Sequence, residues 1–500
     1  MSNLSGYDSE AVGFPSITRS KRPETSSSTQ TSEYSESGTG CQTNLVKDIG
    51  CNIVPGDVKV EAPNYSPQRL NEFLRRVVPT MLEQLDENDR EVLCNSSDSD
   101  DEETITAKLF QELEIKVDSN LASGDQKTPT VLSLSWSSAG NSLAVSLGHT
   151  QHESWCNHDG VIKIFTIKRT AGDKLVHSLD INEKNCVSVV KYHHSLAALL
   201  AYGTVTGEVV IINMRDGSDF HDGMQLTSPA GCHGTKRVSA LQWADASLAN
   251  TYLSIHISNT GKRRGASDQI LFSSGSDGTI NVWQVNSNFK VFENVMCYAI
   301  NGSKKMVAPD ISCFDFIRVF PLRPSDEKVS DDVFVVGAKS GKLYLCKIKS
   351  KQILEGNLVD PVTEVFDGHA MCVLDVSFSL QRPGLFASLS IDSELRLYDI
   401  NQYGPLKVMC LDVAVSCMSW LSSSPCVVVG TDGDKHQLRV YDVGCGREVA
   451  VEGLAVSGGV TAVAVTLGGS CRVAASDTNL KLRLWELPTR RGRLMAEEQF

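Results

Sequence analysis

The sequence lacks the patterns that mark a secreted, membrane-spanning or metal-stabilised protein. No run of about 18 apolar residues occurs, and the start, MSNLSGYDSE, has no basic region followed by an apolar one. The fifteen cysteines are scattered, odd in number and free of any C-x-x-C pair, so neither a disulfide framework nor a metal site is indicated. We therefore expect a protein of the reducing cytoplasm, with no cofactor and no metal ion.

Positive charge is also scarce. The chain has 47 basic and 60 acidic residues, a net charge of -13, which opposes attraction to nucleic-acid phosphates and to anionic membranes. We expect protein partners, with no nucleic acid and no membrane insertion.

A catalytic constellation is missing as well. Catalysis needs a nucleophile, a base and an orienting group, or metal ligands at fixed spacing. The best local clusters are Cys156-Asn157-His158-Asp159, Cys232-His233 and His193-His194. We interpret all three as ordinary turn and loop residues, and the chain as not an enzyme.

The first 65 residues have too few apolar side chains to form a core. Ser and Thr occupy 17 of residues 1–60, without apolar periodicity, so we expect residues 1–65 to be a disordered tail. The tail carries two similar triplets, Thr29-Gln30-Thr31 and Cys41-Gln42-Thr43.

An amphipathic helix is predicted in residues 66–93. Its apolar positions recur at three- and four-residue spacing, after Ser66 as cap and Pro67 in the first turn; they include Leu70, Phe73, Leu74, Val77 and Met81. Residues 94–129 then form an acidic linker that includes SSDSDDEE.

Beyond residue 130, seven segments repeat one pattern, in which a short strand and a turn precede an alternating strand with an apolar or aromatic residue near its end. Aligned on that residue, they bring into register Phe165, Ile212, Trp283, Cys346, Tyr398, Tyr441 and Trp485. The gaps of 47, 71, 63, 52, 43 and 44 residues match four-stranded propeller blades. We predict an all-β, seven-bladed propeller over residues 130–487, followed by a C-terminal tail, 488–500.

The repeat resembles the WD-repeat β-propeller family, most clearly in the fifth blade. The resemblance implies a hydrogen-bonded set that stabilises this blade, formed by His369, Ser388, Asp392 and Tyr398. The third blade matches only in part, at Asp277 and Trp283. The seventh blade lacks an obvious outer strand, which either 112–117 or GRLMAEEQF at the C-terminus could supply. We favour 112–117, because it leads into the first blade.

The order of tail, helix, acidic linker and propeller resembles the dynein intermediate chains. Within that family CQTNLVKDIGCN, LNEFLRRV and TPTVLSLSWSSAG are similar to the smaller type of intermediate chain in cytoplasmic dynein-2, the motor of retrograde intraflagellar transport. Residues 1–60 show no heptads, which differs from the coiled-coil start of the dynein-1 chains.

This resemblance implies a non-catalytic motor subunit that supports cilium assembly, located in the cytoplasm, cytoskeleton, cilium and basal body. Its partners would be the dynein-2 heavy chain, a second intermediate chain and two light chains. The two triplets would bind the hub-type light chain by strand addition, and Leu70, Phe73, Leu74, Val77 and Met81 the roadblock-type light chain. Two alternatives stay open: the helix folds against the propeller, or the chain is a WD-repeat scaffold or ubiquitin-ligase substrate receptor.

Overall fold

The computed structural model forms two units, residues Met1–Thr80 and Met81–Phe500, which are described separately. It describes residues 73–78 and most of 105–487. The positions left undescribed within the second range are 118–128, 151, 153–155, 157, 169–172, 215–224, 246–247, 250–267, 287–288, 301–307, 318–331, 351, 354–357, 383, 423, 433–436 and 468–470. In the first unit, residues 73–78 are helical. Across the described ranges, no helix has the length and apolar character needed to cross a membrane.

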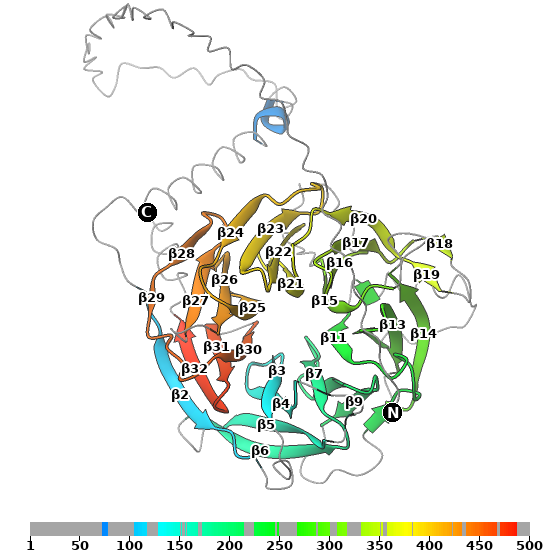
Figure 1. Cartoon of the computed structure of the whole chain (residues 1–500), viewed down its shortest axis with the longest axis vertical. Helices are drawn as coiled ribbons and strands as arrows, with labels where there is room; N and C mark the ends of the chain where they lie inside the picture. Colours follow the sequence, from blue (N-terminus) through cyan, green and yellow to red (C-terminus); the bar gives the residue numbers. More distant parts are fainter. Residues whose placement is uncertain are drawn as a thin grey trace, which may run out of the picture. The chain divides into compact units, whose positions relative to one another are not determined.

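The second unit is a ring of seven blades, each with four antiparallel strands ordered from the centre outwards (Figure 1). The expected seven-bladed propeller is therefore confirmed. Blade 1 comprises β3 Thr130–Trp136, β4 Ser142–Gly148, β5 Gly160–Lys168 and β6 Lys174–Glu183. Blade 2 comprises β7 Val187–Tyr192, β8 Leu199–Thr204, β9 Val209–Asn213 and β10 Gln225–Thr227. Blade 3 comprises β11 Val238–Trp243, β12 Gln269–Gly275, β13 Thr279–Val285 and β14 Phe292–Ala299.

The remaining blades repeat this order. Blade 4 comprises β15 Ile311–Phe316, β16 Val333–Ala338, β17 Leu343–Lys347 and β20 Val362–Phe366. Blade 5 comprises β21 Val373–Phe378, β22 Leu385–Ser390, β23 Glu394–Asp399 and β24 Lys407–Cys410. Blade 6 comprises β25 Val415–Trp420, β26 Cys426–Thr431, β27 Leu438–Asp442 and β28 Arg447–Val449. Blade 7 comprises β30 Val460–Val465, β31 Cys471–Asp477, β32 Lys481–Leu487 and β2 Lys108–Glu114.

Two short additions extend the sheets beyond the blade pattern. The outer strand of blade 3, β14, pairs in parallel with β19 Val359–Asp360, which pairs in turn with β18 Gln352–Ile353, so this sheet has six strands. In addition, β1 Ile105–Thr106 pairs in parallel with β29 Val451–Glu452.

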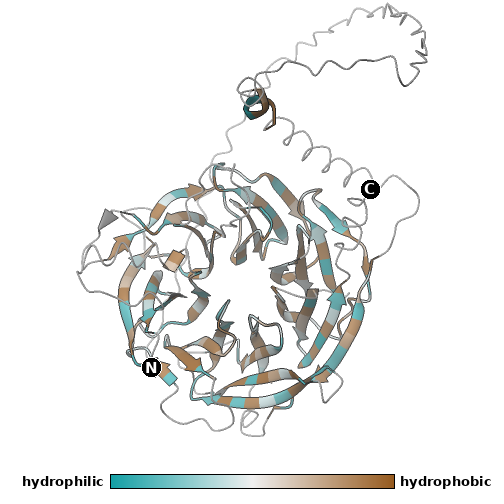
Figure 2. Ribbon diagram, turned by 180° about the vertical axis from the view of Figure 1, so that it is seen from behind, coloured by the Kyte–Doolittle hydropathy of each residue, from teal (hydrophilic) through white to brown (hydrophobic). Residues whose placement is uncertain are grey.

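The seven residues aligned by sequence all lie on the third strand of a blade, each opposite an apolar residue of the second strand. Phe165 pairs with Leu143, Trp283 with Leu271 and Trp485 with Val473. The second strands are buried almost throughout, because a neighbouring blade covers each face. The outer strands are half-exposed, and Figure 2 shows hydrophobic and hydrophilic residues alternating along them.

Every blade has a β-bulge near the start of its first strand, where one residue of that strand is skipped in the pairing with the second. The skipped residue is Ser or Thr in five blades, namely Ser188, Ser239, Ser312, Ser416 and Thr461. In each of these five, the side-chain hydroxyl donates to a carbonyl oxygen of the second strand of its own blade, as Ser188 does to Gly203 at 3.1 Å. A side-chain bond thus compensates for the interrupted backbone ladder.

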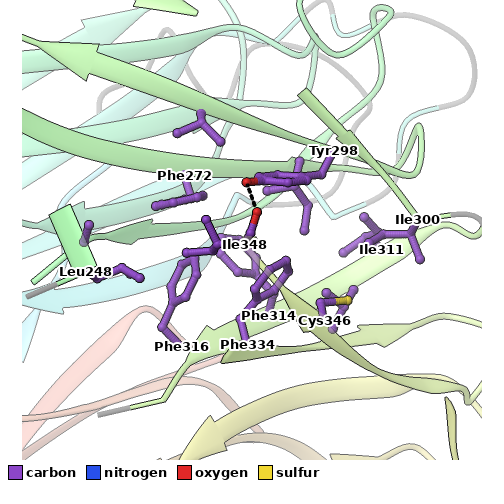
Figure 3. Close-up of a cluster of buried hydrophobic side chains, with 14 of the residues drawn as sticks. Leu248, Phe272, Tyr298, Ile300, Ile311, Phe314, Phe316, Phe334, Cys346 and Ile348 are labelled. Atoms are coloured by element: carbon purple, nitrogen blue, oxygen red, sulfur yellow. Dashed lines mark hydrogen bonds between the residues drawn. The ribbon is translucent and has the colours of Figure 1, made fainter. Parts of the chain in front are cut away.

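Neighbouring blades are joined both by apolar packing and by tryptophan hydrogen bonds. The indole Nε1–H of Trp243 donates to Lys191 in the preceding blade, and that of Trp420 to Ser377. Figure 3 shows the apolar cluster between blades 3 and 4, where the buried Tyr298 hydroxyl donates to the carbonyl of Ile348 at 3.1 Å.

The ring is closed by β2, from before the first blade, which pairs antiparallel with β32. The closing strand therefore comes from the favoured side of the chain, but it runs over Lys108–Glu114, earlier than the expected 112–117. Gln111 of β2 also exchanges two hydrogen bonds with the backbone of Leu175 in blade 1, at 3.0 and 2.8 Å. The innermost strands meet too, since Trp136 donates to Ala464 at 3.2 Å.

We predict that a chain beginning at residue 118 is less stable than one beginning at residue 104. The first lacks β2, so β32 becomes an open edge that invites unwanted pairing, whereas the second keeps β2 whole. Thermal unfolding with light scattering should show a lower midpoint and more aggregation for the shorter chain. Equal midpoints and equal scattering would mean that β2 does not hold the ring closed.

Candidate functional site

The described part of the fifth blade contains the hydrogen-bonded set expected around His369. This histidine is buried and comes from the link between blades 4 and 5. Its Nε2 lies 2.7 Å from the Ser388 hydroxyl on β22, and its Nδ1 lies 3.2 Å from the Asp392 carboxylate in the following turn. The set therefore ties the incoming link to two parts of the same blade.

Tyr398 takes a different place from the one the resemblance implied. Its hydroxyl donates to the backbone carbonyl of Asp367 at 2.7 Å, not to Ser388. The hydroxyl of Tyr398 lies at the far end of its ring, beyond Ser388. It therefore holds Asp367, at the start of the link between blades 4 and 5. The ring itself stacks on Phe386 at 5.1 Å.

The third blade has a more complete set, which sequence reasoning missed. His233 Nε2 lies 2.8 Å from Ser273, the indole of Trp283 donates to the same hydroxyl at 2.8 Å, and His233 Nδ1 lies 3.3 Å from Asp277. Ser273 precedes Trp283 by ten residues, as Ser388 precedes Tyr398, and that spacing was a usable signal. The long insertion before β12 separates His233 from Ser273 in the sequence, so the pattern of residues did not show that the two side chains meet.

His193, another residue first interpreted as part of an ordinary loop, is a buried polar link between blades 2 and 3. Its Nδ1 accepts hydrogen bonds from the backbone N–H groups of Ser195 and Leu196, and its Nε2 lies 2.8 Å from the side-chain oxygen of Gln269. Burial, with the neighbouring His194, lowers the pKa of His193 to about 4. The ring is therefore neutral at pH 7, and it acts as a structural group.

The expected light-chain segments fall mostly outside the described residues. Thr29, Gln30, Thr31, Cys41, Gln42, Thr43, Leu70 and Met81 all lie there. Residues 73–78 are described, and within this helix Phe73 is 50% and Leu74 44% exposed, while Val77 is half-buried. An exposed aromatic residue beside an exposed leucine is available to a partner.

A curated relative matches much of the chain. The ciliary dynein intermediate chain 2 of Heliocidaris crassispina is 24% identical over 339 residues, which are 65% of this chain and 42% of that relative. The chain thus spans less than half the length of the relative. No protein-family model matches. The chain is therefore similar in sequence to a ciliary dynein intermediate chain, and its fold is a seven-bladed propeller.

A solved structure has a similar fold. A chain of the crystal structure of the mitotic checkpoint complex superimposes with a TM-score of 0.51 at 13% identity, covering 77% of this chain and 93% of the other. At that identity the likeness shows the propeller fold alone.

We predict that His233→Ala and His369→Ala each lower the free energy of unfolding by about 1–3 kcal/mol, because each removes the hydrogen bonds that a buried histidine makes with a serine and with an aspartate. Urea unfolding with an unchanged m-value would report this change. A suitable control is His177→Ala, since His177 is a half-exposed partner of Asp180 and surface pairs contribute about 0–1 kcal/mol. Losses no larger than the control's would show that the two sets do not stabilise their blades.

We also predict that stability falls as the pH is lowered from 7 to 5. The pKa of His193 is lowered in the folded chain to about 4, and burial also lowers the pKa of His369. The unfolded chain, with histidine pKa values near 6.5, binds protons first. For His193 alone the loss is about 2 kcal/mol at pH 5. His193→Gln should flatten the dependence of the urea midpoint on pH, and an unchanged slope would contradict the assignment.

Proposed function

We propose that the chain is a non-catalytic intermediate chain of the cytoplasmic dynein-2 motor, acting in retrograde intraflagellar transport and cilium assembly. The observation that carries the proposal is the match to a dynein intermediate chain named as ciliary, across a closed seven-bladed ring. The assignment to dynein-2 in particular is based on the resemblance of the N-terminal segments CQTNLVKDIGCN and LNEFLRRV. The proposed locations are the cytoplasm, the cytoskeleton, and the cilium with its basal body.

In this proposal the propeller binds the dynein-2 heavy chain. A ring whose blades are joined by buried hydrogen bonds is a rigid platform, and protein partners bury exposed apolar side chains. Among the described residues, several such side chains occur on blade 5 and its loops, with Tyr403 68%, Met371 51% and Ile391 49% exposed. Blade 5 is therefore the first part of the ring to examine for this contact.

The N-terminal segment would hold the light chains, and through them a second intermediate chain. The helix that contains residues 73–78 is proposed to dock on a roadblock-type light chain through Leu70, Phe73, Leu74, Val77 and Met81. Support comes from the exposed apolar side chains of Phe73 and Leu74, which a helix-binding groove would bury. The tail triplets are proposed to add a strand to the hub-type light chain.

We predict that Phe73→Asp with Leu74→Asp abolishes binding of the roadblock-type light chain, because each carboxylate would enter a desolvated groove unpaired. The matched control is Arg75→Ala with Arg76→Ala, which lowers the net charge by the same amount at two exposed positions. Pull-down by residues 1–95 should fail for the first pair and persist for the second. If the aspartate pair still binds, the helix is not the docking element.

We predict that Gln30→Gly and Gln42→Gly each weaken hub-type light-chain binding, and that the double change weakens it more, since two sites on one tail bind with avidity. Glycine keeps the tail flexible while removing the side chain that the partner would read. Calorimetry on a peptide of residues 22–58 gives both affinity and stoichiometry. A stoichiometry of one that Gln30→Gly leaves unchanged would reduce the proposal to a single site at Cys41-Gln42-Thr43.

A further inference from the structure

The loop between the second and third strands of blade 1 is longer than its counterparts. Residues 149–159 separate β4 from β5, whereas only 276–278 separate β12 from β13 and only 391–393 separate β22 from β23. Blade 1 also has no histidine set like those of blades 3 and 5 among its described residues. Instead, its described loop residues include three histidines and one cysteine.

This loop approaches the link that leads into blade 2. A Cβ on Gly160, where the loop ends, would lie 2.2 Å from the carbonyl oxygen of Asn185. The two segments are therefore in direct contact, which brings Cys186 beside the loop. The thiols of Cys156 and Cys186 and one ring nitrogen each of His152 and His158 all lie within 4.8 Å of one another.

Each of the two sulfur atoms accepts a hydrogen bond from a backbone N–H group. The backbone N–H of Cys186 points to the Cys156 sulfur at 3.3 Å, and that of His149 to the Cys186 sulfur at 3.3 Å. Outer-shell donors of this kind orient and stabilise metal-bound ligands.

One of the histidines has a buried nitrogen with no hydrogen-bond partner in the part of the chain that the structure describes. The Nε2 of His152 is buried and has no hydrogen-bond partner among the described residues. An unpaired buried ring nitrogen costs free energy unless something binds it. A metal ion bound through this nitrogen would satisfy it.

We propose that His152, Cys156, His158 and Cys186 form a structural zinc site at the joint between blades 1 and 2. Two thiolates and two imidazoles are a ligand set that favours tetrahedral Zn²⁺. With Zn–S near 2.3 Å and Zn–N near 2.0–2.1 Å, ligand atoms of a tetrahedral site lie about 3.3–3.8 Å apart. The side chains thus need to move inward by only about 1 Å to coordinate the ion.

The proposed site would stabilise blade 1 as the sets around His233 and His369 stabilise blades 3 and 5, by fixing a loop and a link to each other. Zinc would fix the long loop to the link that carries Cys186 into β7, and both thiols would release their protons on binding. The expectation of no metal ion rested on the scattered cysteines and the lack of a C-x-x-C pair; Cys186, thirty residues beyond Cys156, gives no such spacing signal. This inference does not depend on the motor assignment.

The test is metal analysis of the full chain, purified under reducing conditions without chelator. We expect about one zinc per chain. In the metal-free chain titrated with Co²⁺, we expect a thiolate-to-cobalt charge-transfer band and tetrahedral d–d bands. His152→Ala should weaken zinc binding by at least about 10–100-fold, and Cys156→Ser should remove the charge-transfer band or reduce it. His152→Ala removes no hydrogen bond that Nε2 makes to a described residue, so its folding is expected to survive.

The controls are Cys410→Ser, which changes an exposed cysteine outside the cluster, and His177→Ala, which changes a surface histidine. Both should keep the full zinc content. A chelator should lower the unfolding midpoint of the unchanged chain and leave that of His152→Ala unaffected. Zinc that is absent, or equally bound by all variants, would overturn the proposal. A Cys156–Cys186 disulfide in the reduced preparation, found by peptide mass mapping, would overturn it as well.

Discussion

The pairing of β2 with β32 is the constraint on which the rest of the propeller depends. Seven sheets can bury both of their faces only if the last one meets the first, and the last sheet lacks an outer strand of its own. A segment from before blade 1 supplies that strand, and Gln111 fastens it to Leu175 of blade 1. The Trp136 bond to Ala464 closes the inner wall at the same joint. The strands of blade 7 that follow blade 6 in the chain do not lead into blade 1, so these hydrogen bonds take the place of the covalent link that joins every other pair of neighbouring blades.

Closure from the N-terminal side has a consequence for the proposed motor role. The strand that completes the ring begins about thirty residues after the helical segment 73–78, and it is continuous with that segment along the chain. Tension on the proposed light-chain-binding region would therefore act on β1 and β2 before the other strands of the ring. The salt bridges of Glu112 with Lys481 and Arg483 add support there, although such exposed pairs contribute little each.

The repeating strands could be predicted from sequence because both faces of each second strand are buried, which leaves apolar runs, and the third strands keep an aromatic or apolar residue in register. Contacts between segments distant in the sequence could not be predicted in this way. His233 was separated from Trp283 by an insertion, and Cys186 meets His152 only once blades 1 and 2 are joined. The bulges in the first strands could not be predicted for another reason. In the sequence, a serine such as Ser188 resembles an ordinary exposed position, and only the structure shows that its hydroxyl replaces a backbone hydrogen bond.

Binding to a dynein heavy chain tests the central claim most directly. The chain beginning at residue 104 retains the closed ring and lacks the light-chain segments, so it isolates the propeller. Mixed with the tail of a dynein-2 heavy chain and analysed by size-exclusion chromatography with light scattering, it should form a complex whose mass is the sum of its parts. Separate elution of the two proteins at micromolar concentration, by a ring shown to be folded, would contradict the account.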